Sequence, residues 1–172
     1  MATKTARRTE QDLLGVYLND HLAGATVGVG LVRRMAASAE PGSETATVVK
    51  PLVSEITADR SALVKMMAAV GVKIRGYKLL AAWAGEKAGR LKLNGYVLAR
   101  SPLSALEETE MLRLGVEGKA AGWRTLQVVA QRDHRLDAGQ LDELLARATR
   151  QSDTLESLRV SIAEQVLTGA DR

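Results

Sequence analysis

Apolar residues recur every three or four positions through most of the chain, which is the period of a helix with one buried face. Four segments are long enough to form the helices of a bundle: residues 9–37, 45–70, 101–131 and a last segment that begins after Asp137. No segment shows the sustained alternation of apolar and polar residues that is typical of a strand. The pattern therefore predicts an all-α fold with four main helices.

Each predicted helix has one row of positions that we expect to face the interior, and together these rows define the predicted core. In the first helix the row is Leu14, Leu18, His21, Ala25, Gly28, Val32 and Met35. In the second helix it is Leu52, Ile56, Asp59, Leu63, Met66 and Val70. In the third helix it is Leu103, Glu110, Leu114, Glu117, Ala121 and Val128. In the last helix it is Leu141, Leu144, Ala148, Gln151, Leu155, Leu158, Ile162 and Val166.

Residue types that start or stop helices set the expected boundaries. Thr9 opens a segment that resembles a capping box, and Pro51 either kinks the second helix or marks its start. Ser101 is the expected cap of the third helix, with Pro102 at the first helical position. Asp137 is the expected cap of the last helix.

A connection of about thirty residues, 72–101, separates the second helix from the third, whereas short loops join the other pairs. It contains an expected short helix at 76–88, and it is long enough to cross the bundle from one end to the other. We therefore predict a single domain over residues 1–172. Its architecture is a four-helix bundle with a long crossover between helices two and three, preceded by a disordered tail at 1–8.

One polar residue lies near the middle of each predicted inward row: His21, Asp59, Glu117 and Gln151. If the first and last helices run in one direction and the other two in the opposite direction, all four residues lie within about one helical turn of height. Polar and charged side chains are rarely buried unless they are paired or bind something. We therefore interpret these four residues as a polar core layer and as the candidate site.

Two main interpretations of this layer remain open, and a third is that it binds a small ligand other than a metal. In the first, His21, Asp59 and Glu117, with Asp20 and Glu55 nearby, bind a single divalent metal such as zinc, manganese or iron. In the second, the layer is a hydrogen-bonded network that fixes the register of the helices and needs no cofactor. The candidate partners in such a network are Arg60, Lys119 and Arg124.

Short segments spread over most of the chain carry a family resemblance. They are Tyr17-Leu18-Asn19-Asp20-His21-Leu22-Ala23-Gly24, Glu55-Ile56, Asp59-Arg60, Gly71-Val72, Arg90-Leu91-Lys92-Leu93-Asn94-Gly95, Ser101-Pro102-Leu103-Ser104, Gly115-Val116 and Gly118-Lys119. In these segments the chain resembles the ferritin-like superfamily, and within it a group of helical proteins of unknown function from high-GC bacteria. The resemblance implies a ferritin-like bundle, and it brings no activity with it.

The resemblance does not extend to the di-iron signature of the wider superfamily. Di-iron carboxylate bundles use a Glu from each of two helices and a Glu-x-x-His from each of the other two. The residues three positions before His21 and His134 are Leu18 and Gln131. The sequence therefore favours the fold and disfavours di-iron oxidase chemistry.

Basic residues are concentrated in and around the predicted crossover, although the net charge of the whole chain is only +4. A basic segment of this kind can attract nucleic acid or phosphate. Aromatic side chains, which nucleic-acid-binding proteins use for base stacking, make up only 3% of the chain. The basic residues are Lys73, Arg75, Lys78, Lys87, Arg90 and Lys92.

The composition excludes several kinds of site. The chain has no Cys, so disulfides, thiolate metal sites and thiol nucleophiles are excluded. The longest uncharged apolar stretch, 22–32, is too short to span a bilayer, and no signal-peptide pattern is present, so we expect a cytoplasmic protein. We expect a structural or interaction protein, most simply a homodimer. The alternatives are a metal-dependent enzyme and a nucleic-acid-binding protein.

Overall fold

The computed structural model describes residues 4–76 and 103–169, and these residues form four long helices with no strand among them. The helices are α1 (Lys4–Ser38), α2 (Glu44–Ala69), α4 (Ser104–Ala130) and α5 (Ala138–Ala163). A short π-helical segment, η1 (Glu164–Thr168), extends α5. The predicted all-α architecture with four main helices is therefore confirmed. The predicted crossover helix lies, apart from Gly76, outside the described residues.

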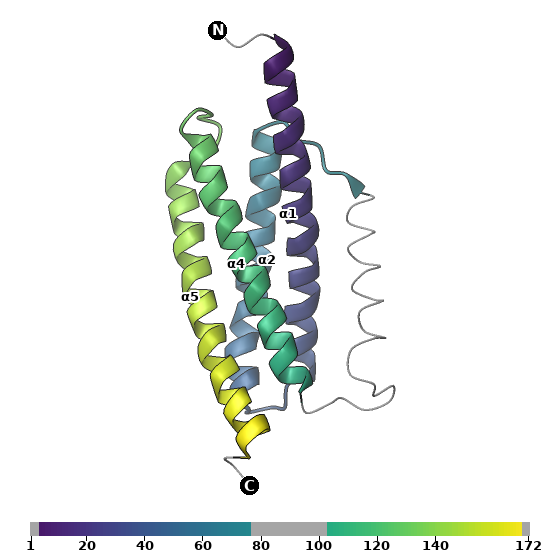
Figure 1. Cartoon of the computed structure of the whole chain (residues 1–172), viewed down its shortest axis with the longest axis vertical. Helices are drawn as coiled ribbons and strands as arrows, with labels where there is room; N and C mark the ends of the chain where they lie inside the picture. Colours follow the sequence, from purple (N-terminus) through teal and green to yellow (C-terminus); the bar gives the residue numbers. More distant parts are fainter. Residues whose placement is uncertain (1–3, 77–102, 170–172) are drawn as a thin grey trace.

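The four helices lie side by side as a bundle, with α1 and α5 running in one direction and α2 and α4 in the other (Figure 1). The broadest interfaces join α1 to α2 and α4 to α5, and thinner ones join α1 to α4 and α2 to α5. The chain therefore forms two antiparallel helix pairs. The helix α2 ends at the opposite end of the bundle from the start of α4 (Figure 1).

Two of the predicted helix starts are wrong. The helix α1 begins at Lys4, ahead of Thr9, and so includes most of the stretch predicted as a tail. Lys, Ala and Arg in that stretch are all good helix formers, which explains the extension. The helix α4 begins at Ser104 with Leu103 at its cap position and no side-chain cap, so Ser101 is not its cap.

The other two helices begin with side-chain caps. Asp137 caps α5 as predicted, because its Oδ1 accepts a hydrogen bond from the backbone N of Gln140 at 3.2 Å. The helix α2 is capped by Ser43, whose Oγ accepts from the backbone N of Ala46 at 3.1 Å. Pro51 lies inside α2 at an exposed position and does not mark its start.

The predicted inward rows of α2 and α5 are confirmed. Every predicted residue of the α2 row is buried, and in α5 the row is buried from Leu141 to Ile162, with only Val166 partly exposed. In α1, Leu18, Val32 and Met35 are buried, while the rest of the predicted row, His21 included, is half-buried. The α1 row also missed Leu22, which is fully buried.

The predicted inward row of α4 is wrong, because it lies on the solvent side of the helix. Leu114 and Val128 are 63% and 64% exposed, and Glu117 is exposed as well. Both rows on α4 obey helical spacing, but the buried one carries more apolar area, including the indole of Trp123. The buried residues of α4 are Leu106, Thr109, Leu112, Val116, Ala120, Gly122, Trp123, Leu126 and Ala130.

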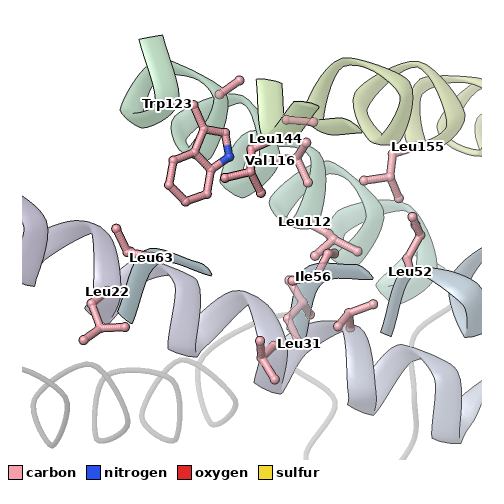
Figure 2. Close-up of a cluster of buried hydrophobic side chains, with 14 of the residues drawn as sticks. Leu22, Leu31, Leu52, Ile56, Leu63, Leu112, Val116, Trp123, Leu144 and Leu155 are labelled. Atoms are coloured by element: carbon pink, nitrogen blue, oxygen red, sulfur yellow. The ribbon is translucent and has the colours of Figure 1, made fainter. Parts of the chain in front are cut away.

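Figure 2 shows the side chains of the true α4 face within the core. Leu112 and Trp123 extend from α4 into the space that this helix shares with α1 and α2, where Leu22, Leu31 and Leu63 lie (Figure 2). Among the residues that the structure describes, the buried apolar core has Trp123 as its one aromatic side chain, consistent with a chain that contains no Phe.

Candidate functional site: an ion-pair network and a cavity

Asp59 of α2 is the most deeply buried charged residue described, with 1% of its surface exposed. Two cations from the neighbouring helix pair compensate its carboxylate. The Nζ atom of Lys119 in α4 lies 2.5 Å from Asp59 Oδ2. Arg147 in α5 donates to Asp59 Oδ1 from Nε at 2.8 Å and also from Nη2. A buried carboxylate is tolerated only when it is paired in this way.

Gln151 of α5 extends these ion pairs into a network. It is 2% exposed, and its amide oxygen accepts a hydrogen bond from Lys119 Nζ. Its amide nitrogen donates to Glu55 Oε2 at 2.8 Å and lies 3.4 Å from Asp59 Oδ2. The network contains two carboxylates, two cations and one amide from three helices, so its formal charge is zero. We call these five residues, Glu55, Asp59, Lys119, Arg147 and Gln151, the internal network.

Burial lowers the pKa of Lys119 below its ordinary value. The nearby carboxylates of Asp59 and Glu55 act in the opposite direction, and the positive charge of Arg147 adds to the lowering. The position of Lys119 between a carboxylate and an amide oxygen therefore stabilises an ammonium that burial alone would disfavour.

His21 lies on α1 against α4 and does not belong to the internal network: within the described residues no hydrogen bond joins it to the five members. Its ring centroid is 4.4 Å from that of Tyr17, with a tilt of 56° between the ring planes. A Cβ atom at Gly122 would come within 3.0 Å of the ring atoms Cε1 and Nδ1 of His21, so the ring fits because this position is a glycine. Burial lowers the pKa of His21, and the carboxylate of Asp20 partly opposes the shift.

The structure brings together only half of the predicted polar layer. Asp59 and Gln151 meet, as expected, whereas His21 lies apart and Glu117 is exposed. Glu117 Oε1 accepts a hydrogen bond from the hydroxyl of Ser152 in α5, at the edge of the bundle. Residues 117 and 119 are about 200° apart around a helix, so the burial of Lys119 directs Glu117 toward solvent.

Of the predicted network partners, Lys119 is correct and the other two are not. Arg60 donates instead to Thr26 Oγ1 of α1 at 3.0 Å, and Arg124 is exposed. The sequence interpretation missed Arg147, which lies four residues before Gln151 on the same face of α5. The signal in the sequence was a cation four residues from Gln151, a polar residue already expected to be buried.

The predicted metal ligands are not brought together. No group of three or more His, Cys, Asp or Glu residues in the described chain is arranged to hold a metal ion. Glu55 and Asp59 lie one turn apart on α2, but their oxygens are engaged by Gln151, Lys119 and Arg147. Asp20 and Glu117 lie at exposed positions on α1 and α4.

A cavity of about 700 Å³ lies between α1 and α4 and is lined mostly by apolar residues. Side-chain hydrogen bonds join α1 and α4 near the two ends of the cavity. Tyr17 Oη donates to Thr125 Oγ1 at 3.0 Å near one end, and Arg34 Nε donates to Glu108 Oε1 at 3.3 Å near the other. Asp59, Lys119 and His21 contribute to the lining, so the internal network borders this space.

Glycines hold this cavity open. The lining includes Gly24 and Gly28 of α1 and Gly115 and Gly118 of α4. A Cβ atom built at any of these four positions would have no neighbour within 4 Å among the described residues. Neither α1 nor α4 places a side chain there, so these two helices do not fill the space between them.

Only the first part of the predicted basic patch is described. Lys73 is exposed and Arg75 is half-buried, in the extended segment that follows α2. The buried side chain of Asn19 fixes this segment, because its Nδ2 donates to the carbonyl of Lys73 at 3.0 Å and its Oδ1 accepts from the backbone N of Arg75 at 2.7 Å. Lys78, Lys87, Arg90 and Lys92 lie outside the described residues.

Comparison of the chain with protein-family models, with characterised proteins and with solved structures finds no match. Among the described helices, none is long and apolar enough to cross a membrane.

Proposed function

We propose that this protein is a non-enzymatic interaction protein that pairs with a second copy of itself through the outer side of α4. The observation that carries the proposal is a row of apolar residues on that side: Leu114, Ala121 and Val128 are all exposed. They are spaced seven residues apart, so they point in nearly the same direction from the helix. An apolar row at this spacing is typical of a helix that packs against another helix.

The internal network supports a structural role for the buried polar residues. Its two carboxylates are engaged by two cations and an amide, and its members come from α2, α4 and α5. A buried polar cluster of this kind fixes how helices align, because any shift in register leaves a charge unpaired. The proposed role of the network is to hold α4 in the orientation that presents its outer row.

We also propose that the bundle is ferritin-like. The supporting observations are the two antiparallel pairs and a connection that joins opposite ends of the bundle (Figure 1). The cytoplasmic location and the bacterial origin stay predictions from the sequence.

The test is the molar mass of the full chain in solution, measured by light scattering over a range of protein concentrations. We expect the wild type to form a dimer and Val128→Glu to be monomeric, because a carboxylate would be buried in the paired surface. Ala146→Glu places the same carboxylate at an exposed position of α5 and should stay dimeric. A monomeric wild type, or a Val128→Glu protein that still forms a dimer, would refute the proposal.

A further inference from the structure

We propose that the cavity between α1 and α4 binds an elongated aliphatic molecule with an uncharged, oxygen-containing head group. Leu114 of the outer row also lines this cavity, but the observations that support the proposal do not depend on the proposed pairing. Four lines of observation support the proposed site: the size of the cavity, its glycines, the polar groups at one end and the charge balance of its lining.

The cavity has the dimensions of a small-molecule site. Its volume of about 700 Å³ lies within the range that ligand pockets occupy. On α1 its lining extends from Tyr17 to Leu31, and on α4 from Met111 to Leu126. At a rise of about 1.5 Å per residue, each wall is roughly 21 Å long, so the space is a trough along the helix axes. An extended chain fits such a trough better than a compact ring system does.

The glycines of the lining are not explained by packing within the chain. Gly122 has a packing reason, since a Cβ there would collide with the ring of His21. In the part of the chain that the structure describes, Gly24, Gly28, Gly115 and Gly118 have no such neighbour within 4 Å. A helix with glycine at an interior position is less stable than the same helix with alanine there. Four glycines beside the cavity therefore lower the stability of α1 and α4, and no contact in the described structure offsets this loss. A molecule that occupies the trough supplies the missing contact.

A hydrogen-bond donor and an aliphatic surface lie toward opposite ends of the trough. Trp123 lines the cavity with its ring, whereas its indole Nε1 is fully buried and is not accessible from the cavity. Lys119, which also lines the cavity, has three ammonium hydrogens and gives two of them to Asp59 and Gln151. Toward the other end the lining includes Leu31 and is apolar. A molecule with an acceptor at one end and an aliphatic tail matches this gradient.

The charges around the donor favour an uncharged head group. The internal network is formally neutral, and the ionisable lining residues are Tyr17, Asp20, His21, Asp59 and Lys119. A carboxylate head would lie near two carboxylates, and an ammonium head would lie near Lys119. An alcohol oxygen can accept a hydrogen bond from Lys119 without either repulsion.

Dodecan-1-ol is the probe that tests the proposal, with binding to the full chain measured by isothermal titration calorimetry. We expect saturable binding of one molecule per chain. Gly115→Leu and Gly24→Leu each place a side chain in the trough from opposite walls, and each should weaken binding at least tenfold. Ala146→Leu adds the same side chain on the exposed side of α5 and should bind as the wild type does. Thermal unfolding of each variant shows that it is folded.

Three results would overturn the proposal. The first is no saturable binding of dodecan-1-ol by the wild type. The second is unchanged affinity in both filled variants while they remain folded. The third is tighter binding of dodecanoate or dodecylammonium than of the alcohol, which would refute the uncharged head group. The molar mass of the wild type is measured separately, so these failures are distinguishable from a failure of the proposed pairing.

Discussion

Lys119 Nζ of α4 and Asp59 Oδ2 of α2 lie 2.5 Å apart, although these two helices do not pack directly against each other in the described bundle. The pair therefore joins helices on a diagonal of the bundle. Arg147 and Gln151 complete the link from α5, so a single carboxylate connects three helices.

Replacing Asp59 with Leu should destabilise the protein by about 3 kcal/mol or more, because it leaves Lys119 and Arg147 without their buried counter-charge. Lys119→Met should lower the free energy of unfolding by less, because Asp59 still has Arg147 as a counter-charge. The loss of stability in the double variant should differ from the sum of the two single losses by an interaction energy of about 1–3 kcal/mol. The measurement is urea unfolding of the four proteins. The exposed pair of Asp133 and Arg135 provides the control, and removing it should leave the free energy of unfolding close to that of the wild type.

Two glycines of α4 should respond in opposite directions to the same substitution. Gly118→Ala should stabilise the protein by about 0.5–1 kcal/mol, because the new methyl group meets no neighbour and the helix gains propensity. Gly122→Ala should destabilise it by about 1 kcal/mol, because the methyl group displaces the ring of His21. Combining Gly122→Ala with His21→Ala should remove the clash. Equal effects of the two single substitutions would contradict the placement of His21.

Stability should depend on pH through His21. Burial lowers its pKa in the folded state below the ordinary value of 6.5 that the unfolded chain keeps. Between these two values the unfolded state binds more protons, so stability falls as the pH drops through 6.5 and levels off below the folded pKa. Denaturant unfolding at a series of pH values measures this loss. The carboxylates of Asp20 and Asp59 line the same cavity as His21, and the variant that tests this prediction leaves both of them in place.

His21→Gln should remove the part of the pH dependence that lies in this window. The matched variant is His134→Gln, in the exposed loop between α4 and α5, which should keep the dependence of the wild type. If both substitutions leave the pH profile unchanged, the burial of His21 does not contribute to stability in this window.

The cap of α5 gives a prediction that is independent of the site. Asp137→Ala should lower the free energy of unfolding by about 1 kcal/mol, because the backbone N of Gln140 loses its hydrogen-bond acceptor. Asp137→Asn keeps an acceptor oxygen and should be close to the wild type. Thermal unfolding of the two variants distinguishes the cap from a general effect of the loop.

The sequence predicted the fold well where each helix has one clear apolar row. The rows of α2 and α5 are interrupted only by Asp59 and Gln151, so helical spacing alone identified their buried faces. In α4 two rows have the same spacing, and the one that includes Leu114 and Val128 lies on the outside. Periodicity cannot distinguish two such rows, because the choice depends on how much apolar area each one buries against its neighbours.

The candidate site was predicted only in part for the same reason. Asp59 and Gln151 lie on helices whose faces were correctly identified, and they meet. Glu117 was predicted on the wrong face of α4. Lys119 lies in the internal network, where Glu117 was expected. The cavity could not be predicted, because the glycines of α1 and α4 that line it come together only when these two helices pack against each other.

The buried polar residues of α2, α4 and α5 form a network whose charges compensate one another without a metal, which is the basis of the proposed structural role. Elemental analysis of the full protein, purified without chelator, tests this most directly, with Asp59→Asn as the comparison. We expect no zinc, manganese or iron in stoichiometric amount in either protein. One equivalent of a divalent metal in the wild type, lost in Asp59→Asn, would contradict the claim and favour a metal-dependent function.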